Sequence, residues 1–192
     1  METNRKPRLL AICGSLRKES ANRKLLTVAV AGARKAGAEV REIDLLDFPM
    51  AAYNEDDHLR DGLPDAAQRM RELFFAHDGA LFAVPEYNNS LPGGFKNVLD
   101  RASRKDDHGS CFDGKFAAIM GASGSGGGAR RCLAEMRNIL HMLGMHVIPE
   151  QFSLPNGRKA FDPGGRLLDA EGEEKAAAVG ARLTEVVRRL AF

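Results

Sequence analysis

Apolar residues recur along this chain with two different periods, which predict strands alternating with helices. The segments Leu9–Cys13 and Ala80–Val84 are apolar throughout, as expected of parallel strands that are covered by helices on both faces. Between them, Leu26, Val30 and Ala33 recur at helical spacing, which indicates one buried face of a helix. The combination predicts an α/β fold.

The rest of the chain continues this alternation. Further strands are expected at Ala38–Asp44, Phe116–Met120 and Met145–Pro149, the last of them short. Helices are expected after residue 20 with an end at Gly37, from Asp65, from Phe95, before Gly144, and over Ala176–Leu190. Five strands alternating with five helices predict a parallel sheet with right-handed crossovers, and no repeat or linker divides residues 1–192 into two domains.

The segment Leu45–Leu63 shows neither period and is expected to be a long irregular loop. Loops of this length in compact domains are often functional, and surface padding is the alternative. The sequence leaves both interpretations open.

Composition narrows the class of protein. With 192 residues, 44% of them hydrophobic, the chain is long enough for one well-buried domain. The net charge of +2 is small and the Lys and Arg residues are scattered among acids, so nucleic-acid binding has no electrostatic support. No signal peptide or membrane span is expected. The three cysteines show no C-x-x-C spacing, which favours a reducing, cytoplasmic setting.

The segment Ala11–Arg23 changes abruptly from apolar to polar and cationic, as at a strand, a loop and the start of a helix. Such a loop exposes backbone N–H groups at the positive end of a helix dipole, where an anion is favoured. Side chains that suit a phosphate lie in it: Ser15, Arg17, Ser20 and Asn22. Serine and asparagine are also favoured as helix caps in any protein, so this loop alone leaves open whether they cap a helix or bind a phosphate.

Two more loops of unusual composition follow strands. Pro85–Gly94 combines prolines, glycines and hydrogen-bonding side chains, and Gly121–Gly128 is rich in glycine. In an open sheet of order 2-1-3-4-5, the ligand crevice lies at the carboxyl ends of strands one and three, where the order reverses. Those strands precede the first two loops. We therefore expect one shared site, with a phosphate at the first loop and a ring system at the second.

The segments Gly14–Asn22 and Pro85–Asn97, in this order, resemble the paired signature of the NAD(P)H-dependent FMN reductases, which include bacterial quinone and chromate reductases. The glycine-rich loop and Phe161–Leu167 also resemble that family, so the likeness covers most of the chain. It implies a flavodoxin-like three-layer sandwich, non-covalent FMN, NADPH or NADH as co-substrate, and a homodimer or homotetramer. The electrons would pass to a small-molecule acceptor: a quinone, a metal oxyanion such as chromate, an azo compound or free flavin.

The resemblance also implies roles for individual residues. The FMN phosphate would be bound by Ser15, Arg17, Ser20, Ala21 and Asn22. The ribityl chain and isoalloxazine would be lined, largely through backbone groups, by Pro85, Glu86, Tyr87, Asn88, Asn89 and Ser90, with Ser123 approaching from the third loop. Hydride transfer is chemistry of the cofactor, so no side chain is expected to act as a dedicated acid or base.

Other interpretations of the same residues remain. Gly124-x-Gly126-x-x-Ala129 fits a dinucleotide fingerprint, although too few residues follow it for a Rossmann domain. Asp56-Asp57-His58 and Asp106-Asp107-His108 resemble metal-ligand clusters, but solvated loop charge is favoured and no metal is expected. Tyr87 would be a buried loop anchor if the family likeness were ignored, and Met142 and Met145 suit either a subunit contact or the core.

Two other functions are alternatives to a reductase. The first is a flavodoxin-like electron carrier that has no turnover of its own. Such carriers tend to be strongly acidic so that they dock on basic partners, which the pI of about 8.5 disfavours. The second is a protein that binds a phosphate ligand without any flavin.

Overall fold

Parallel strands form the centre of the molecule. The computed structural model describes residues 5–104 and 108–190. Within them the sheet has five strands in the order β2-β1-β3-β4-β5, which confirms the predicted flavodoxin-like topology. The strands are β1 (Arg8–Cys13), β2 (Glu39–Ile43), β3 (Gly79–Ala83), β4 (Phe116–Ala122) and β5 (His146–Leu154).

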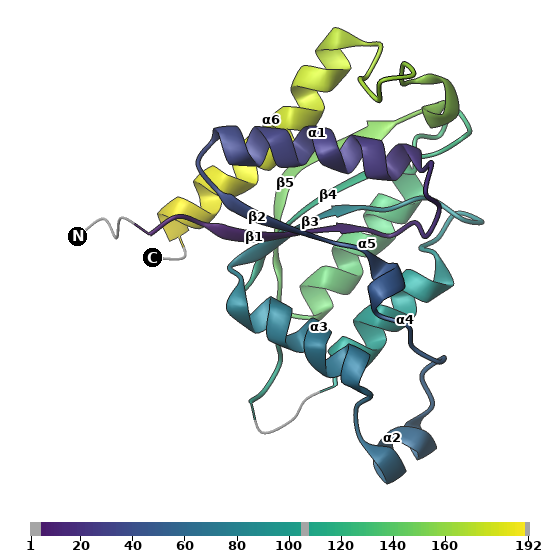
Figure 1. The fold of residues 1–192 in the computed structure, drawn as a ribbon, viewed down its shortest axis with the longest axis vertical. Coiled ribbons are helices and arrows are strands. Elements are labelled where there is room, and N and C mark those ends of the chain that lie inside the picture. The colour runs from purple at the N-terminus through teal and green to yellow at the C-terminus, as the bar shows by residue number, and fades with distance from the viewer. Residues whose placement is uncertain (1–4, 105–107, 191–192) are drawn as a thin grey trace.

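Helices cover both faces of this sheet (Figure 1). One face carries α1 (Ala21–Lys35) and α6 (Ala170–Leu190), and the other carries α3 (Asp65–Ala76), α4 (Gly93–Ala102) and α5 (Arg130–Met142). Successive strand residues point to opposite faces, so Leu9 and Ala11 join the core under α1 and α6, whereas Leu10 and Ile12 join the other core. This burial on two sides explains why the central strands are apolar throughout.

The predicted helix ends at glycines are confirmed. Gly37 and Gly144 follow α1 and α5 with positive φ angles of 97° and 90°, the conformation in which glycine terminates helices. The last helix begins earlier than predicted, at Ala170 rather than Ala176. Met145 is buried in the core, as one of the two alternatives has it, whereas Met142 is exposed and does not fill the core.

The prediction that Leu45–Leu63 is irregular throughout is wrong. The segment contains the 3-10 turn η1 (Leu45–Asp47) and a sixth α-helix, α2 (Glu55–Asp61), which projects from the rest of the fold (Figure 1). The Asn54 side chain caps α2 by accepting a hydrogen bond from the N–H group of Asp56 at 3.0 Å. None of the residues of α2 is buried. The helix therefore has no apolar stripe by which its sequence could have revealed it.

The prediction of a short last strand over Met145–Pro149 is also wrong, because β5 runs on to Leu154. Its register with β4 shifts between Ala117 and Ile119, and this irregularity accommodates the proline, which has no N–H group to donate. Arg137 Nη1 donates to the carbonyl groups of Val147 at 3.2 Å and Ile148 at 2.9 Å. Backbone oxygens that the bulge releases are thereby satisfied.

The first suspected metal cluster, Asp56-Asp57-His58, is not assembled, and most of the second lies outside the described residues. Asp57 pairs with Arg60 at 2.9 Å, and Asp106 and Asp107 lie outside the described residues. No group of three or more His, Cys, Asp or Glu residues within 5–104 and 108–190 is arranged to hold a metal ion. In the same ranges no helix combines the length and apolar character that crossing a bilayer requires.

Helices α1 and α6 approach each other so closely that the contact requires glycine. A Cβ atom on Gly180 would lie 1.9 Å from the carbonyl oxygen of Ala29, and one on Gly32 would lie 2.0 Å from that of Ala177. The two backbones therefore touch where the helices cross. This crossing fixes the position of α1, whose first turn borders the site described below.

We expect Gly180→Ala to lower the free energy of unfolding by about 1–3 kcal/mol, the usual penalty for overpacking. Alanine is favoured over glycine in a helix by about 1 kcal/mol, so helix propensity alone would stabilise the variant. A loss of stability would therefore come from the steric contact. Gly94→Ala in α4 is the matched control, because a Cβ there meets nothing within 4 Å. Urea denaturation should show the control at or above wild-type stability; a Gly180→Ala protein as stable as wild type would contradict the close contact.

Candidate functional site

Three polar loops leave the same edge of the sheet. The first loop (residues 14–20) follows β1, the second loop (84–92) follows β3, and the third loop (123–129) follows β4. These three strands are neighbours, and the order of the sheet reverses between β1 and β3. The predicted convergence of the first two loops at the switch point is therefore confirmed.

The loops also begin at the same level along the strands. Cys13 of β1 is in register with Ala83 of β3. Beyond the strand ends, the N–H group of Gly14 donates to the carbonyl of Ala83 and that of Val84 donates to the carbonyl of Met120, both at 2.9 Å. The first residues of the first and second loops are thus extensions of the sheet, and their backbones are fixed.

Both serines of the first loop are buried and both bind backbone N–H groups. Ser20 Oγ accepts a hydrogen bond from the N–H group of Asn22 at 3.2 Å and caps α1, and Ser15 Oγ accepts from that of Arg17 at 3.4 Å. Each hydroxyl keeps its own proton for another acceptor. The cap that the sequence left as an alternative is therefore present, and it remains compatible with an anion at the positive end of α1.

Asn22 holds α1 to the end of a different strand. Its Nδ2 atom donates to the carbonyl of Ala122 at 2.9 Å, and its Oδ1 atom accepts from the N–H group of Ala122 at 2.8 Å. The side chain is only 3% exposed. Asn22 therefore serves the site by placing the first turn of α1, which begins at the half-buried Ala21, beside the third loop.

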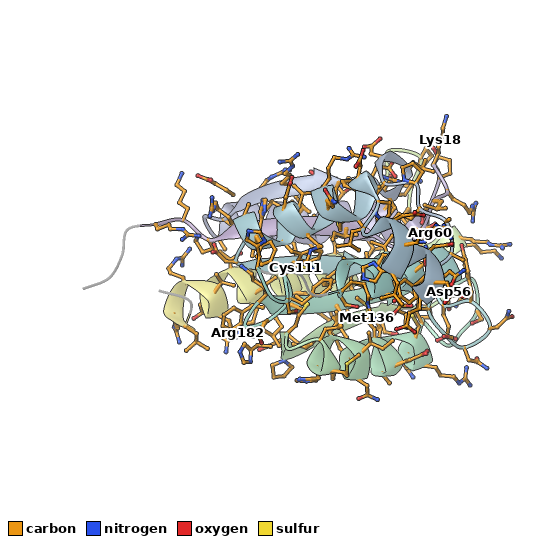
Figure 2. All side chains as sticks on the ribbon, turned by 90° about the horizontal axis from the view of Figure 1, so that it is seen from below. Lys18, Asp56, Arg60, Cys111, Met136 and Arg182 are labelled. Atoms are coloured by element: carbon orange, nitrogen blue, oxygen red, sulfur yellow. The ribbon has the colours of Figure 1, made fainter. Side chains whose placement is uncertain are left out.

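The first loop also carries cations without a local counter-ion. Arg17 and Lys18 are exposed, and neither has an ion-pair partner among the residues that the structure describes. Lys18 projects from the end of the molecule opposite to that of Arg182 (Figure 2). Uncompensated positive charge beside a helix N-terminus attracts anions.

The second loop contains a tight turn. The backbones of Tyr87 and Ser90 exchange two hydrogen bonds of 3.0 Å, and the residues between them, Asn88 and Asn89, have φ angles of 51° and 68°. Two successive positive φ angles define a type I′ turn, in which asparagine is favoured. Tyr87 is 48% exposed, so the alternative that it is a buried anchor is wrong, and its ring is open to a ligand.

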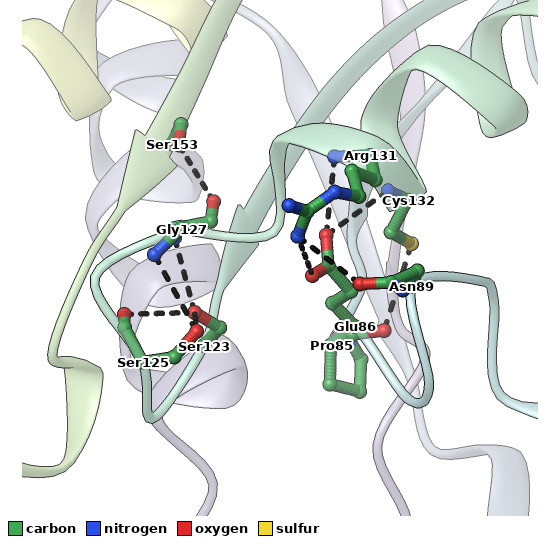
Figure 3. A network of polar contacts seen from close by, with 10 residues as sticks. Pro85, Glu86, Asn89, Ser123, Ser125, Gly127, Arg131, Cys132 and Ser153 are labelled. Carbon is green, nitrogen blue, oxygen red and sulfur yellow. Dashed lines mark hydrogen bonds and ion pairs between the residues drawn. The ribbon is translucent and has the colours of Figure 1, made fainter.

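Glu86 fixes this turn to helix α5 (Figure 3). Its Oε2 atom accepts hydrogen bonds from the N–H groups of Arg131 at 3.1 Å and Cys132 at 3.2 Å. Ala129, the residue before α5, provides no side-chain cap, so a carboxylate from another loop takes that role. Arg131 closes the network by donating from Nη1 to Asn89 Oδ1 at 3.1 Å. The Glu86 side chain is only 8% exposed.

The third loop is held by its own side chains and by β5. Ser123 Oγ donates to the carbonyl of Ser125 and accepts from the N–H group of Gly128, both at 3.0 Å (Figure 3). Ser153 Oγ donates to the carbonyl of Gly128 at 2.6 Å. This loop lies between β4 and the edge strand β5. It is therefore not at the switch point, where a dinucleotide fingerprint would be expected.

Two cysteines lie beneath the loops. Burial raises the pKa of the Cys13 thiol, and burial together with Glu86 and Glu135 raises the pKa of Cys132 to about 12. Both thiols are neutral at physiological pH, and Cys132 Sγ lies 3.6 Å from the carbonyl of Pro85. The two residues therefore contribute packing rather than redox chemistry.

Two arginines at this edge, Arg131 and Arg158, were not expected from the sequence. Arg131 takes part in the Glu86 network, and Arg158 lies in the 3-10 turn η2 (Gly157–Lys159) after β5. The N–H groups of Asn156 and Gly157 donate to the carbonyls of Ser125 and Ser123, at 3.0 and 2.8 Å. Pro-Asn-Gly is a recognisable turn signal, but nothing local tells which loop that turn will meet.

One known protein family and several known proteins are similar to this chain. The family described as NADPH-dependent FMN reductase matches residues 7–159. An NAD(P)H-dependent FMN reductase of Pseudomonas aeruginosa is 39% identical over 168 residues, which cover 87% of this chain and 88% of the relative. A probable NADPH:quinone oxidoreductase of Oryza sativa subsp. japonica is 38% identical over 173 residues, covering 88% of this chain and 82% of the relative.

A solved structure agrees with the sequence relatives. The flavoenzyme NAD(P)H:(acceptor) oxidoreductase from Paracoccus denitrificans superposes with a TM-score of 0.80 at 27% identity. The match covers 95% of this chain and 98% of that protein. The similarity therefore extends over the whole sheet and its helices.

We expect Glu86→Ala to lower the free energy of unfolding by about 1–2 kcal/mol, because it removes the only side-chain cap of α5 within the described residues. Glu135→Ala is the control, since Glu135 is exposed on the same helix and its removal should change stability by less than about 0.5 kcal/mol. Urea denaturation at neutral pH compares the two. Equal stability of both variants would show that the Glu86 carboxylate does not cap α5.

Proposed function

Because the chain belongs to the NADPH-dependent FMN reductase family, we propose that it oxidises NADPH or NADH through bound FMN and passes the electrons to a small-molecule acceptor. It is an NAD(P)H-dependent FMN-containing oxidoreductase of the quinone reductase type. The observation that carries the proposal is the placement of an anion-binding loop and a shaped turn on the adjacent strands β1 and β3.

The groups at this edge fit FMN. The hydroxyls of Ser15 and Ser20, the N-terminus of α1 and the guanidinium of Arg17 form a donor set suited to a phosphate. A Cβ atom on Gly14 would lie 3.1 Å from Val84 Cγ1, so glycine is what lets the first loop lie against the second. When bound, FMN supplies a ring that accepts a hydride and releases electrons to a second substrate.

The residues of the chain bind and orient in this proposal. The first loop holds the phosphate, and the type I′ turn presents fixed backbone groups to the ring. Glu86 and Arg131 keep that turn in place, and no side chain is needed as an acid or a base. The residues assigned to the site are Ser15, Arg17, Ser20, Ala21, Asn22, Pro85, Glu86, Tyr87, Asn88, Asn89, Ser90 and Ser123.

The proposal also covers the electron acceptor, the oligomeric state and the cellular location. Quinones are the acceptors named for several relatives, and we extend the proposal to chromate, azo compounds and free flavin. We also propose that residues 1–192 act as one FMN-binding domain within a homodimer or homotetramer. The three cysteines are buried and form no disulfide among the described residues, which suits a reducing cytoplasm.

The function is tested by mixing the purified protein with FMN, NADPH and a quinone. We expect the flavin to bind and NADPH to be consumed steadily, with many turnovers per protein, since each reduced flavin is reoxidised by the quinone. An electron carrier would be reduced once or not at all under these conditions. Repeating the assay with NADH, chromate and an azo dye ranks the co-substrates and acceptors.

We expect Arg17→Ala to weaken FMN binding by about 10- to 100-fold, because a charge-assisted hydrogen bond to phosphate contributes about 1.5–3 kcal/mol. Titration of the apoprotein, followed by flavin fluorescence, measures the dissociation constant. Riboflavin, which lacks the phosphate, should bind the variant and wild type alike. Arg41→Ala removes an exposed cation of β2 and is the control for net charge. Unchanged affinity of Arg17→Ala for FMN would contradict the phosphate role.

A further inference from the structure

The backbone of Arg158 lies beside the proposed phosphate site, although the residues of that site are distant from Arg158 in sequence. The preceding residue, Gly157, is wedged between α1 and β4: a Cβ there would lie 3.1 Å from the Cβ atoms of both Ala21 and Ala122. Ala21 is the first residue of α1, and Ala122 is the last residue of β4. The backbone of Arg158 therefore starts between the N-terminus of α1 and the third loop.

The position of Arg158 is fixed by its surroundings. Asn156 has a φ angle of 52°, which turns the chain back toward the third loop, and the bonds from Asn156 and Gly157 to that loop hold the turn. The side chain of Arg158 then lies along Gly124, with Nε 3.4 Å from where a Cβ on that glycine would be. The backbone at Arg158 is therefore placed before any ligand arrives.

Arg158 also has no counter-ion. It is exposed, and within residues 5–104 and 108–190 no carboxylate or hydrogen-bond acceptor engages its side chain. Arg23 on α1, by contrast, is neutralised by Asp44 at 3.1 Å. Lys24 on the same helix lies 3.7 Å from Glu19. These two cations near the start of α1 are thus compensated, whereas Arg158 presents an uncompensated charge near the same helix end.

A phosphate monoester suits this arrangement. It carries a charge of about −1.5 to −2 near neutral pH, more than the positive end of one helix dipole compensates. The planar fork of an arginine binds two phosphate oxygens at once. Because the turn that carries Arg158 is already held by hydrogen bonds to the third loop, no backbone entropy has to be lost when the side chain binds.

We propose that Arg158 binds a phosphate monoester at the carboxyl edge of the sheet, in addition to the residues of the first loop. This inference rests on the proposed function. Two groups of this chemistry come to the site in that function: the 5′-phosphate of FMN and the 2′-phosphate of NADPH, which NADH lacks. Arg158 thereby selects FMN over riboflavin or NADPH over NADH, and the two sources are separated by experiment.

The test compares Arg158→Ala with Lys159→Ala. Lys159 carries the same charge one residue later, but it lines a cavity of about 410 Å³ between η2 and the start of α6, so it controls for net charge. The apoproteins are titrated with FMN and with riboflavin by flavin fluorescence. The FMN-loaded proteins are assayed for kcat/KM with NADPH and with NADH.

We expect Arg158→Ala to lower one of two discrimination ratios by about tenfold or more. A fall in the affinity ratio of FMN to riboflavin identifies the flavin phosphate as the ligand. A fall in the kcat/KM ratio of NADPH to NADH identifies the 2′-phosphate. Arg158→Lys should restore part of the loss, since it returns the charge without the fork. Arg158→Gln is a second neutral variant, and circular dichroism checks that both neutral variants fold.

The proposal is overturned if both ratios of Arg158→Ala stay within about twofold of wild type, or if Lys159→Ala changes them equally. This result is distinct from failure of the proposed function. If the proposed function fails, the wild-type protein neither binds flavin nor oxidises NADPH, and both proposals are wrong.

Discussion

The two hydrogen bonds between the amide of Asn22 and the backbone of Ala122 organise the carboxyl edge of this sheet. Helix α1 follows β1 in the chain, yet these bonds attach its first turn to the end of β4. The first and third loops are therefore neighbours although their strands are separated by β3. Gly157 completes the contact by packing between Ala21 and Ala122. The N–H groups of the first turn of α1 and the positive end of its dipole, which would bind an anion, are held at this edge by this attachment.

A second feature is that the polar side chains of the loops mostly bind the protein itself. Ser20 caps α1, Glu86 caps α5, and Ser123 holds the third loop. The groups that remain for a ligand are backbone N–H and C=O groups, hydroxyl protons and the unpaired arginines. Backbone groups suit a cofactor that carries its own chemistry, since the protein has only to place the ring and balance the charge of the phosphate.

The buried carboxylate of Glu86 shows how these parts depend on one another. One side chain joins the second loop to α5, and Arg131 on α5 reaches back to Asn89 in the type I′ turn. The type I′ turn and helix α5 are thereby coupled. The raised pKa of Cys132, partly due to Glu86, follows from the same burial and keeps a neutral thiol beneath the loop.

The sequence by itself determined the alternation of strands and helices and the helix ends at Gly37 and Gly144, because periodicity and turn residues act locally. The strand order, and with it the meeting of the first two loops, was expected from the flavodoxin-like topology and not from a local pattern. It did not reveal α2, which buries no side chain, or the continuation of β5 past Pro149, which needs a bulge and Arg137. Only the tertiary structure decided what Asn22 and Glu86 bind. Their partners lie 100 and 45–46 residues away, and no local pattern specifies which distant backbone group completes a hydrogen bond. The same reason explains Arg158, whose place beside α1 depends on how β5 and its following turn pack against the third loop.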